Sequence, residues 1–278
     1  ILAVIAVPTT KMIFGQIDTA AGSKDSQATK AYNLNSAGFG EGSNGPILIV
    51  VKLKEDGSDA AALAKLEKAI AADPDVLAPP APPLYSADRS TAVITVIPKS
   101  APPSDATQAL VDRLRVLAPQ DLAATGQVAY IGGQTAAFID IAEEIKKKLP
   151  ISILIVVALS FLLLMVAFRS VLVPLQAAFM NLLGVAAAYG MLVAVFQWGW
   201  GTGLIGLDGS VPIVSFVPLM MFAILFGLSM DYEVFLVTHI QEEYESGTDN
   251  ETAVVRGLSR SARVITSAAL IMVCVFLG

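Results

Sequence analysis

Three consecutive residues, Asp231, Tyr232 and Glu233, are the best candidates for chemistry in this sequence, because they interrupt a long apolar run. Residues 211–230 carry no charge, and residues 234–237 are again apolar. About twenty such residues in a helix cross a bilayer core of ~30 Å. An ionised Asp at that depth costs ~2.5 to 3.5 kcal/mol on insertion scales, so its presence indicates either a function or a nearby membrane edge.

The position of the membrane edge decides between these two interpretations. If the bilayer begins near Val211, Asp231 is an ordinary solvated residue at the far headgroups. A helix from Ile213 to Ile240, however, is ~42 Å long, which exceeds the bilayer core. If Asp231 lay at the headgroups, the apolar residues 234–237 would protrude beyond the bilayer and be exposed to water. We therefore favour an Asp231 buried at membrane depth, where a carboxyl group favours its neutral form and can exchange protons.

Helical geometry assigns different roles to the polar neighbours of Asp231. Ser229 and Glu233 are four residues apart and share one face of the helix, whereas Glu233 projects about 200° away from Asp231. The two carboxylates are therefore no dyad, and we expect Glu233 to be a structural hydrogen-bonding residue and the second candidate for carrying the proton. His239 lies about 80° around the helix from Asp231. It is either a proton exit or, as we favour, an interfacial histidine with no special role.

Residues 226–236 read Phe-Gly-Leu-Ser-Met-Asp-Tyr-Glu-Val-Phe-Leu, and Glu242-Glu243-Tyr244 follow. This string resembles the tenth transmembrane helix of the mycobacterial-membrane-protein-large (MmpL) transporters, which belong to the resistance-nodulation-division superfamily. The resemblance extends over essentially the whole chain, with one departure: the family often has an Arg near the cytoplasmic end of this helix, where this chain has His239.

The resemblance implies that Asp231 and Tyr232 form half of a proton relay. In the family, an Asp-Tyr pair on the fourth helix meets the pair on the tenth, and proton flow is linked to export of a lipid or another amphiphile. The expected partners are therefore membrane lipid, a hydrophobic substrate and the missing N-terminal half of the same transporter. Protons are the coupling ion, and no other cofactor is expected. The runner-up functions are a sensor or scaffold that does not transport, and a non-transport motor associated with a translocon.

Several other function classes have no support in the residues. There is no phosphate-binding GxxxxGK[ST] sequence for ATP, and a single histidine argues against paired-histidine metal sites. A Ser-His-Asp triad would need His239, so we predict no catalytic residues. The net charge of −6 and the absence of a basic stripe argue against nucleic acid as a partner.

The composition, 55% hydrophobic, is typical of a membrane protein with a soluble insert. We expect residues 1–10 to end one transmembrane helix and residues 11–148 to form a porter-like α+β domain. Residues 149–278 form the transmembrane domain of a helical bundle, with spans near 150–168, 171–197, 212–240 and 264–278. The last span is expected to be truncated, which suggests a fragment of a longer protein. Residues 241–263 are a predicted cytoplasmic loop, in which 251–263 form a short amphipathic helix along the membrane face.

The insert has the pattern of a ferredoxin-like βαββαβ domain, which packs two helices on one face of a sheet. Alternating or β-branched stretches predict strands at 46–53, 91–97 and 127–131, with a weak strand in or after the Pro-rich segment 78–84. Asp59 can cap a predicted helix that ends before Pro74, and Ser104-Asp105 open a second one. A further helix is predicted within 24–38, with Ser23 or Ser26 as its cap, and another over 133–149. Basic residues near the span ends are equally divided between the two sides, so only the resemblance places the domain outside the inner membrane.

Overall fold

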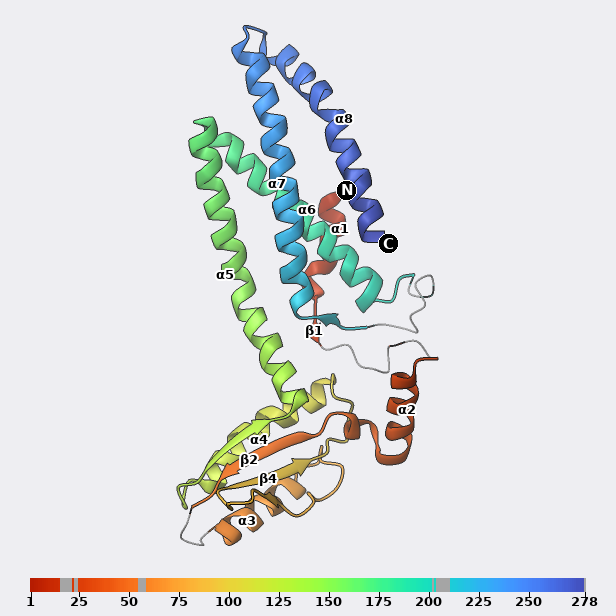
Figure 1. Ribbon diagram of the computed structural model, residues 1–278, viewed down its shortest axis with the longest axis vertical. Helices are drawn as coiled ribbons and strands as arrows, with labels where there is room; N and C mark the ends of the chain where they lie inside the picture. Colours follow the sequence, from red (N-terminus) through yellow and green to blue (C-terminus); the bar gives the residue numbers. More distant parts are fainter. Residues whose placement is uncertain (16–21, 23–24, 55–58, 202, 204–210, 278) are drawn as a thin grey trace. The chain divides into compact units, whose positions relative to one another are not determined.

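The computed structural model describes residues 1–15, 22, 25–54, 59–201, 203 and 211–277 (Figure 1). The chain divides into two compact units. The insert unit comprises Lys11–Lys147 and Leu192–Phe216, and the membrane unit comprises Ile1–Thr10, Lys148–Met191 and Val217–Gly278. Each unit is described by itself.

The insert unit is built on a four-stranded antiparallel sheet in the order β3-β4-β2-β5. Its elements follow one another along the chain in the βαββαβ order that the sequence predicts. They are β2 (Ile47–Lys52), α3 (Asp59–Ala71), β3 (Leu84–Tyr85), β4 (Thr91–Val96), α4 (Asp105–Leu122) and β5 (Val128–Gly132).

One face of this sheet carries the hydrophobic core. Ile49 of β2 is paired with Ile94 of β4, and both side chains are fully buried. The intervening residues of both strands are only half-buried, because successive side chains of a strand point to opposite faces. Helices α3 and α4 supply the other half of the core, from apolar residues at helical spacing: Leu63, Leu66, Ile70, Leu110 and Leu114. The two predicted amphipathic helices therefore cover a single face of the sheet.

Helix α4 begins where the sequence predicts, and Ser104 caps it: the side-chain oxygen accepts a hydrogen bond from the backbone N–H of Thr107 at 3.2 Å. Helix α2 (Gln27–Phe39) begins after Ser26, but the Ser26 side chain, a predicted cap, makes no capping hydrogen bond. The other expected cap, Ser23, lies outside the described residues.

We expect residues 15–133 to fold as an independent soluble domain, because its sheet, α3 and α4 supply nearly all of a continuous core, to which α5 adds Ala136 and Ile139. The purified segment should show mixed α and β circular dichroism and a cooperative unfolding transition. A segment that aggregates, or whose spectrum lacks either component, would contradict this expectation.

An ion-pair network joins the end of α3 to α4. The Arg113 guanidinium donates to both carboxylate oxygens of Asp73 at 2.8 Å and to Asp75 at 2.6 Å. The hydrogen bond from Arg113 is the main reason why the pKa of Asp73 lies below its ordinary value of 3.8. A lowered pKa in the folded state stabilises the fold above the unfolded pKa, and the contribution disappears as the pH falls through the folded value.

The Asp73→Asn variant of the domain should therefore be less stable than the parent at pH 7, by about 1 kcal/mol after allowing for the solvent exposure of Arg113. Urea unfolding at a series of pH values measures the difference. The gap between the two proteins should narrow as the pH falls below the ordinary carboxyl pKa of 3.8 and close once the carboxylate of the folded parent is protonated as well. A gap that stays constant across this range would exclude the ion pair as its cause.

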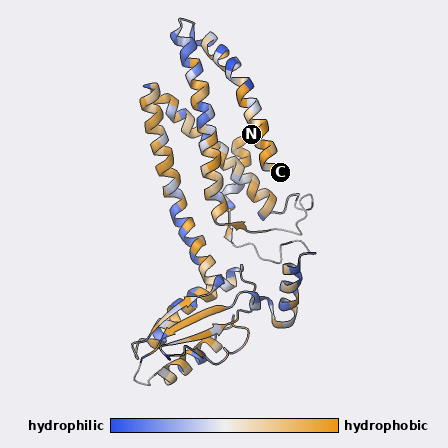
Figure 2. Cartoon of the chain, viewed as in Figure 1, coloured by the Kyte–Doolittle hydropathy of each residue, from blue (hydrophilic) through white to orange (hydrophobic). Residues whose placement is uncertain are grey.

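The membrane unit contains long apolar helices (Figure 2). A short helix, α1 (Leu2–Ala6), is followed by a 3-10 turn (Val7–Lys11). Among the residues that the structure describes, four helices are long and apolar enough to cross a membrane: α5 (Gln134–Phe168), α6 (Leu172–Leu192) with its π-helical extension Val193–Gln197, α7 (Phe216–Glu245) and α8 (Asn250–Leu277). Helix α5 starts in the insert unit and continues without interruption, as the sequence predicts for 133–149.

Two predicted spans are wrong in their boundaries. Residues 212–215 are not helical, because Ile213–Val214 form strand β6, which pairs in parallel with β1 (Phe14–Gly15). Residues 250–277 form one continuous helix, and the predicted break between an amphipathic helix over 251–263 and a span from 264 is absent. Nothing in this stretch forces a break, since it contains no proline and only Gly257 as a weak helix former.

Candidate functional site

A groove between α5 and α7 contains Asp231. The α7 wall consists of residues that recur every three or four positions, as expected for one face of a helix. The opposite wall comes from α5, through Ser152, Val156 and Ser160. The cavity has a volume of about 330 Å³, and its α7 residues are Leu219, Phe222, Ala223, Phe226, Gly227, Met230 and Asp231. Asp231 is thus the one ionisable side chain among apolar groups and two serine hydroxyls.

The Asp231 side chain is exposed within this chain, although the sequence predicts a buried one. The residues that line the groove come from α5 and α7 alone, and these two walls leave the carboxylate accessible. Within the described residues, no hydrogen bond is made by the side chain of Asp231. In the part of the chain that the structure describes, the Asp231 carboxylate is therefore neither buried nor hydrogen-bonded.

Tyr232 and Ser229 do not contact the Asp231 carboxylate in this structure. Tyr232 is half-buried and Ser229 is exposed. Adjacent residues of a helix project about 100° apart, so Tyr232 cannot donate to the carboxylate of its own neighbour without leaving its helix face. The predicted relay, in which Asp231 and Tyr232 meet a second Asp-Tyr pair on another helix, stays a prediction.

Glu233 lies on another side of α7 and contacts α6. Its Oε2 atom accepts a hydrogen bond from Nδ2 of Asn181 at 2.8 Å, and Asn181 is 8% exposed. The same amide nitrogen lies 3.8 Å from the sulfur of Met230. The contact is of the structural kind that we expected for Glu233, and the structure does not bring Glu233 and Asp231 together.

His239 packs on its own helix. Its Nδ1 atom lies 2.9 Å from the carbonyl oxygen of Phe235, and the two rings are 4.4 Å apart between centroids. The structure therefore does not bring His239 to Asp231, and a proton-exit role has no contact to support it.

Sequence reasoning missed two residues that position α7. Besides Asn181, Tyr189 of α6 is buried, and its hydroxyl donates a hydrogen bond to the carbonyl oxygen of Pro218 in the first turn of α7. A usable signal was present, because a polar side chain within an apolar span is costly unless it has a partner or a function.

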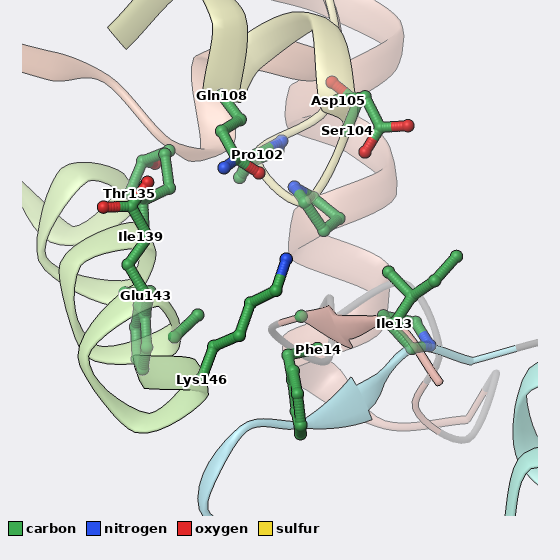
Figure 3. A pocket seen from close by; sticks show the side chains of 15 residues that line it. Ile13, Phe14, Pro102, Ser104, Asp105, Gln108, Thr135, Ile139, Glu143 and Lys146 are labelled. Carbon is green, nitrogen blue, oxygen red and sulfur yellow. The ribbon is translucent and has the colours of Figure 1, made fainter. Parts of the chain in front are cut away.

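A second cavity lies in the insert unit, between β1, the start of α4 and the first turns of α5, and has a volume of about 340 Å³ (Figure 3). The side chain of Lys146 extends into it, above Phe14 and toward the loop that carries Pro102. Asp105 and Glu143 also line the cavity, so its charges are mixed. Among the residues that the structure describes, no three His, Cys, Asp or Glu side chains are grouped closely enough to hold a metal ion.

Comparison with family models and with known proteins points to the same protein family. The model of the MMPL family matches residues 20–278. The chain is 36% identical over its full length to the heme uptake protein MmpL11 of Mycobacterium tuberculosis. It is 36% identical to the membrane protein YdfJ of Bacillus subtilis and 34% identical to the mycolic acid-containing lipids exporter MmpL11 of Mycolicibacterium smegmatis, again over its full length.

The chain spans only part of these relatives, namely 29% of the length of each MmpL11 protein and 38% of YdfJ. The family match nevertheless covers nearly all of the chain, and it includes the helix that carries Asp231. The four apolar helices agree with a protein that crosses the membrane several times. The chain therefore belongs to the MMPL family, as an MmpL-type protein of the resistance-nodulation-division superfamily in the inner membrane.

Proposed function

We propose that this chain forms one half of a proton-driven exporter of lipids or other amphiphilic compounds, and that Asp231 is the residue in it that binds the transported proton. The observation that carries the proposal is the position of Asp231, an ionisable side chain on a groove otherwise lined by apolar residues, serines and a glycine. Such a residue at membrane depth is costly and is retained where it has a task.

The mechanism that we propose uses the proton to change the charge in the groove. A proton that moves down a potential of 100 mV supplies ~2.3 kcal/mol per charge. Protonation of Asp231 removes its charge from the groove, and the helices on either side of the groove then repack toward the state in which the charge is absent. Tyr232, on the neighbouring face, donates a hydrogen bond to the Asp of the partner pair on the fourth helix.

The class of cargo is proposed from two relatives. One is named for heme uptake and another for export of mycolic acid-containing lipids. The names differ in direction, but both describe a large amphiphilic molecule. A sensor or scaffold without transport is not favoured, because these relatives carry a transport role in their names.

We also propose that the insert unit is a ferredoxin-like porter domain outside the inner membrane. The strand order β3-β4-β2-β5 and the chain order βαββαβ support this, because together they place the first strands of the two βαβ halves, β2 and β4, side by side in the centre of the sheet and the last strands, β3 and β5, at its edges. Movement of this domain would follow the repacking of α5, which runs without interruption from the insert unit into the membrane unit.

The proposal is tested with the full-length protein in which this chain occurs, reconstituted into vesicles with a fluorescent amphiphile. Transport should follow an imposed proton gradient and stop when an uncoupler dissipates it. Residues 1–278 alone should not transport, whereas their co-expression with the remainder of the protein should restore some activity. Transport that is unaffected by the uncoupler, or robust transport by residues 1–278 alone, would refute the proposal.

A further inference from the structure

A buried amide of α6 contacts the middle of α7. Asn181, which is 8% exposed, donates a hydrogen bond to Glu233 at 2.8 Å and lies close to the sulfur of Met230. The buried amide of Asn181 has lost its hydrogen bonds to water, so it is stable there mainly through its partner, the half-buried carboxylate of Glu233. The contact therefore joins α6 and α7 at a defined pair of residues.

This contact restrains the rotation of α7 about its own axis. Gly227 and Asp231 are four residues apart and line the groove together, whereas Glu233 projects about 200° away from Asp231. As long as Glu233 is held against α6, Asp231 is turned toward α5. A rotation of α7 by one residue, about 100°, would take Asp231 out of the groove and break the hydrogen bond at the same time.

A second contact at the start of α7 acts in the same sense. The buried hydroxyl of Tyr189 donates to the carbonyl oxygen of Pro218. Asn181 and Tyr189 both lie on α6, at two different heights along α7. A single hydrogen bond would still allow α7 to turn about that contact, whereas the two hydrogen bonds together restrain its rotation.

We propose that Asn181 is a positioning residue of the proton site, whose hydrogen bond to Glu233 fixes the rotation of α7 that presents Asp231 to the groove. The inference rests on the proposed role of Asp231 as the proton carrier. In the described part of the chain, Asp231 is the one ionisable side chain on the groove, and Glu233 is the ionisable side chain that faces Asn181. Asn181 acts through Glu233 and does not touch Asp231.

The full-length protein allows a test by reciprocal exchange. Asn181→Ala and Asn181→Asp each remove the amide donor, and Asn181→Asp also places two carboxyl groups together. The double variant Asn181→Asp/Glu233→Gln keeps both side-chain sizes and restores an amide-to-carboxylate hydrogen bond with the donor reversed. We expect the single variants to lower transport about tenfold and to displace its pH optimum, since misplacement of a reacting group by ~1 Å costs up to about a hundredfold. The double variant should recover most of the transport rate and most of the parent's pH optimum.

Rotation itself is measured by cross-linking, independently of transport. In a cysteine-free background, Ser160→Cys on α5 and Gly227→Cys on α7 place two thiols on opposite walls of the groove, and a side chain at Gly227 meets no other atom within 4 Å. A short bis-maleimide should link them in the parent and in the double variant, and severalfold more slowly in Asn181→Ala. Gln176→Ala, which removes an exposed amide of the same helix, is the matched control and should behave as the parent.

Unchanged cross-linking and an unchanged pH optimum in Asn181→Ala would overturn this inference, as would a double variant no better than Asn181→Asp. These outcomes are distinct from failure of the proposed function. If Asp231→Asn transports normally, the proton site is elsewhere, whatever the cross-linking shows.

Discussion

The Asp231→Asn variant of the full-length protein should lose proton-coupled transport while its amount in the membrane stays unchanged. The amide has nearly the size of the carboxylic acid, so the groove and the packing of α7 are preserved, but it cannot bind or release a proton. Asp231 is exposed on the groove wall and makes no hydrogen bond within the described residues, so no structural contact is lost with it. We expect a reduction of at least about a hundredfold, as for removal of other proton-transfer groups.

Three neighbouring substitutions serve as comparisons. Tyr232→Phe should reduce transport in part, through loss of one hydrogen bond of net worth ~0.5 to 1.5 kcal/mol, or more if its partner is charged. Glu233→Gln should be milder than Asp231→Asn, because an amide at 233 can still accept a hydrogen bond from Asn181. Ser229→Ala should be close to the parent, since Ser229 is exposed. Near-normal export by Asp231→Asn at matched protein levels would place the proton path elsewhere, with Glu233 the next residue to examine.

The second large effect is expected at Gly190 of α6. A Cβ atom at this position would lie 1.8 Å from the carbonyl oxygen of Ile5, a backbone atom that cannot move aside without shifting its helix. The same two segments are joined by a hydrogen bond of 2.8 Å from the Thr9 hydroxyl to the carbonyl oxygen of Ala186. Gly190→Ala should therefore separate α1 from α6 and destabilise the membrane unit by about 1 to 3 kcal/mol, the usual cost of overpacking.

Gly184 of the same helix provides a matched control, because a Cβ atom there meets no other atom within 4 Å. Gly184→Ala should leave the stability unchanged or raise it slightly, since alanine favours a helix by up to ~1 kcal/mol relative to glycine. Thermal aggregation in detergent, compared at equal protein concentration, measures both variants. Equal stability of the two variants would mean that α1 does not pack against α6 as described.

The insert unit could be predicted closely because its signals are local. Apolar residues at helical spacing in α3 and α4, the alternating burial of β2 and β4, and the cap at Ser104 are each set by a few neighbouring residues. Gly184 and Gly190 look equivalent in the sequence, and only the fold shows that Gly190 alone faces α1.

The candidate site could be located in the sequence, but its geometry could not. Helix α7 is apolar on nearly every side, so hydrophobic periodicity does not tell which face meets α5 and which meets α6. The pairing of Asn181 with Glu233 joins residues 52 positions apart, and that of Phe14 with Ile213 joins two short strands that have no periodic pattern. The continuity of α8 was missed because a change from polar to apolar sequence resembles a helix boundary even where nothing breaks the helix.

The central claim, that Asp231 carries the proton, is tested most directly by its chemical reactivity in the full-length protein. A hydrophobic carbodiimide reacts with protonated carboxyl groups in membranes and leaves a stable N-acylurea, which peptide mass spectrometry assigns to a residue. Modification at Asp231 should inhibit transport and fall as the pH rises, while Asp231→Asn should show no adduct in this peptide. Inhibition without an adduct at Asp231, or an adduct that is found only at Glu233, would contradict the claim.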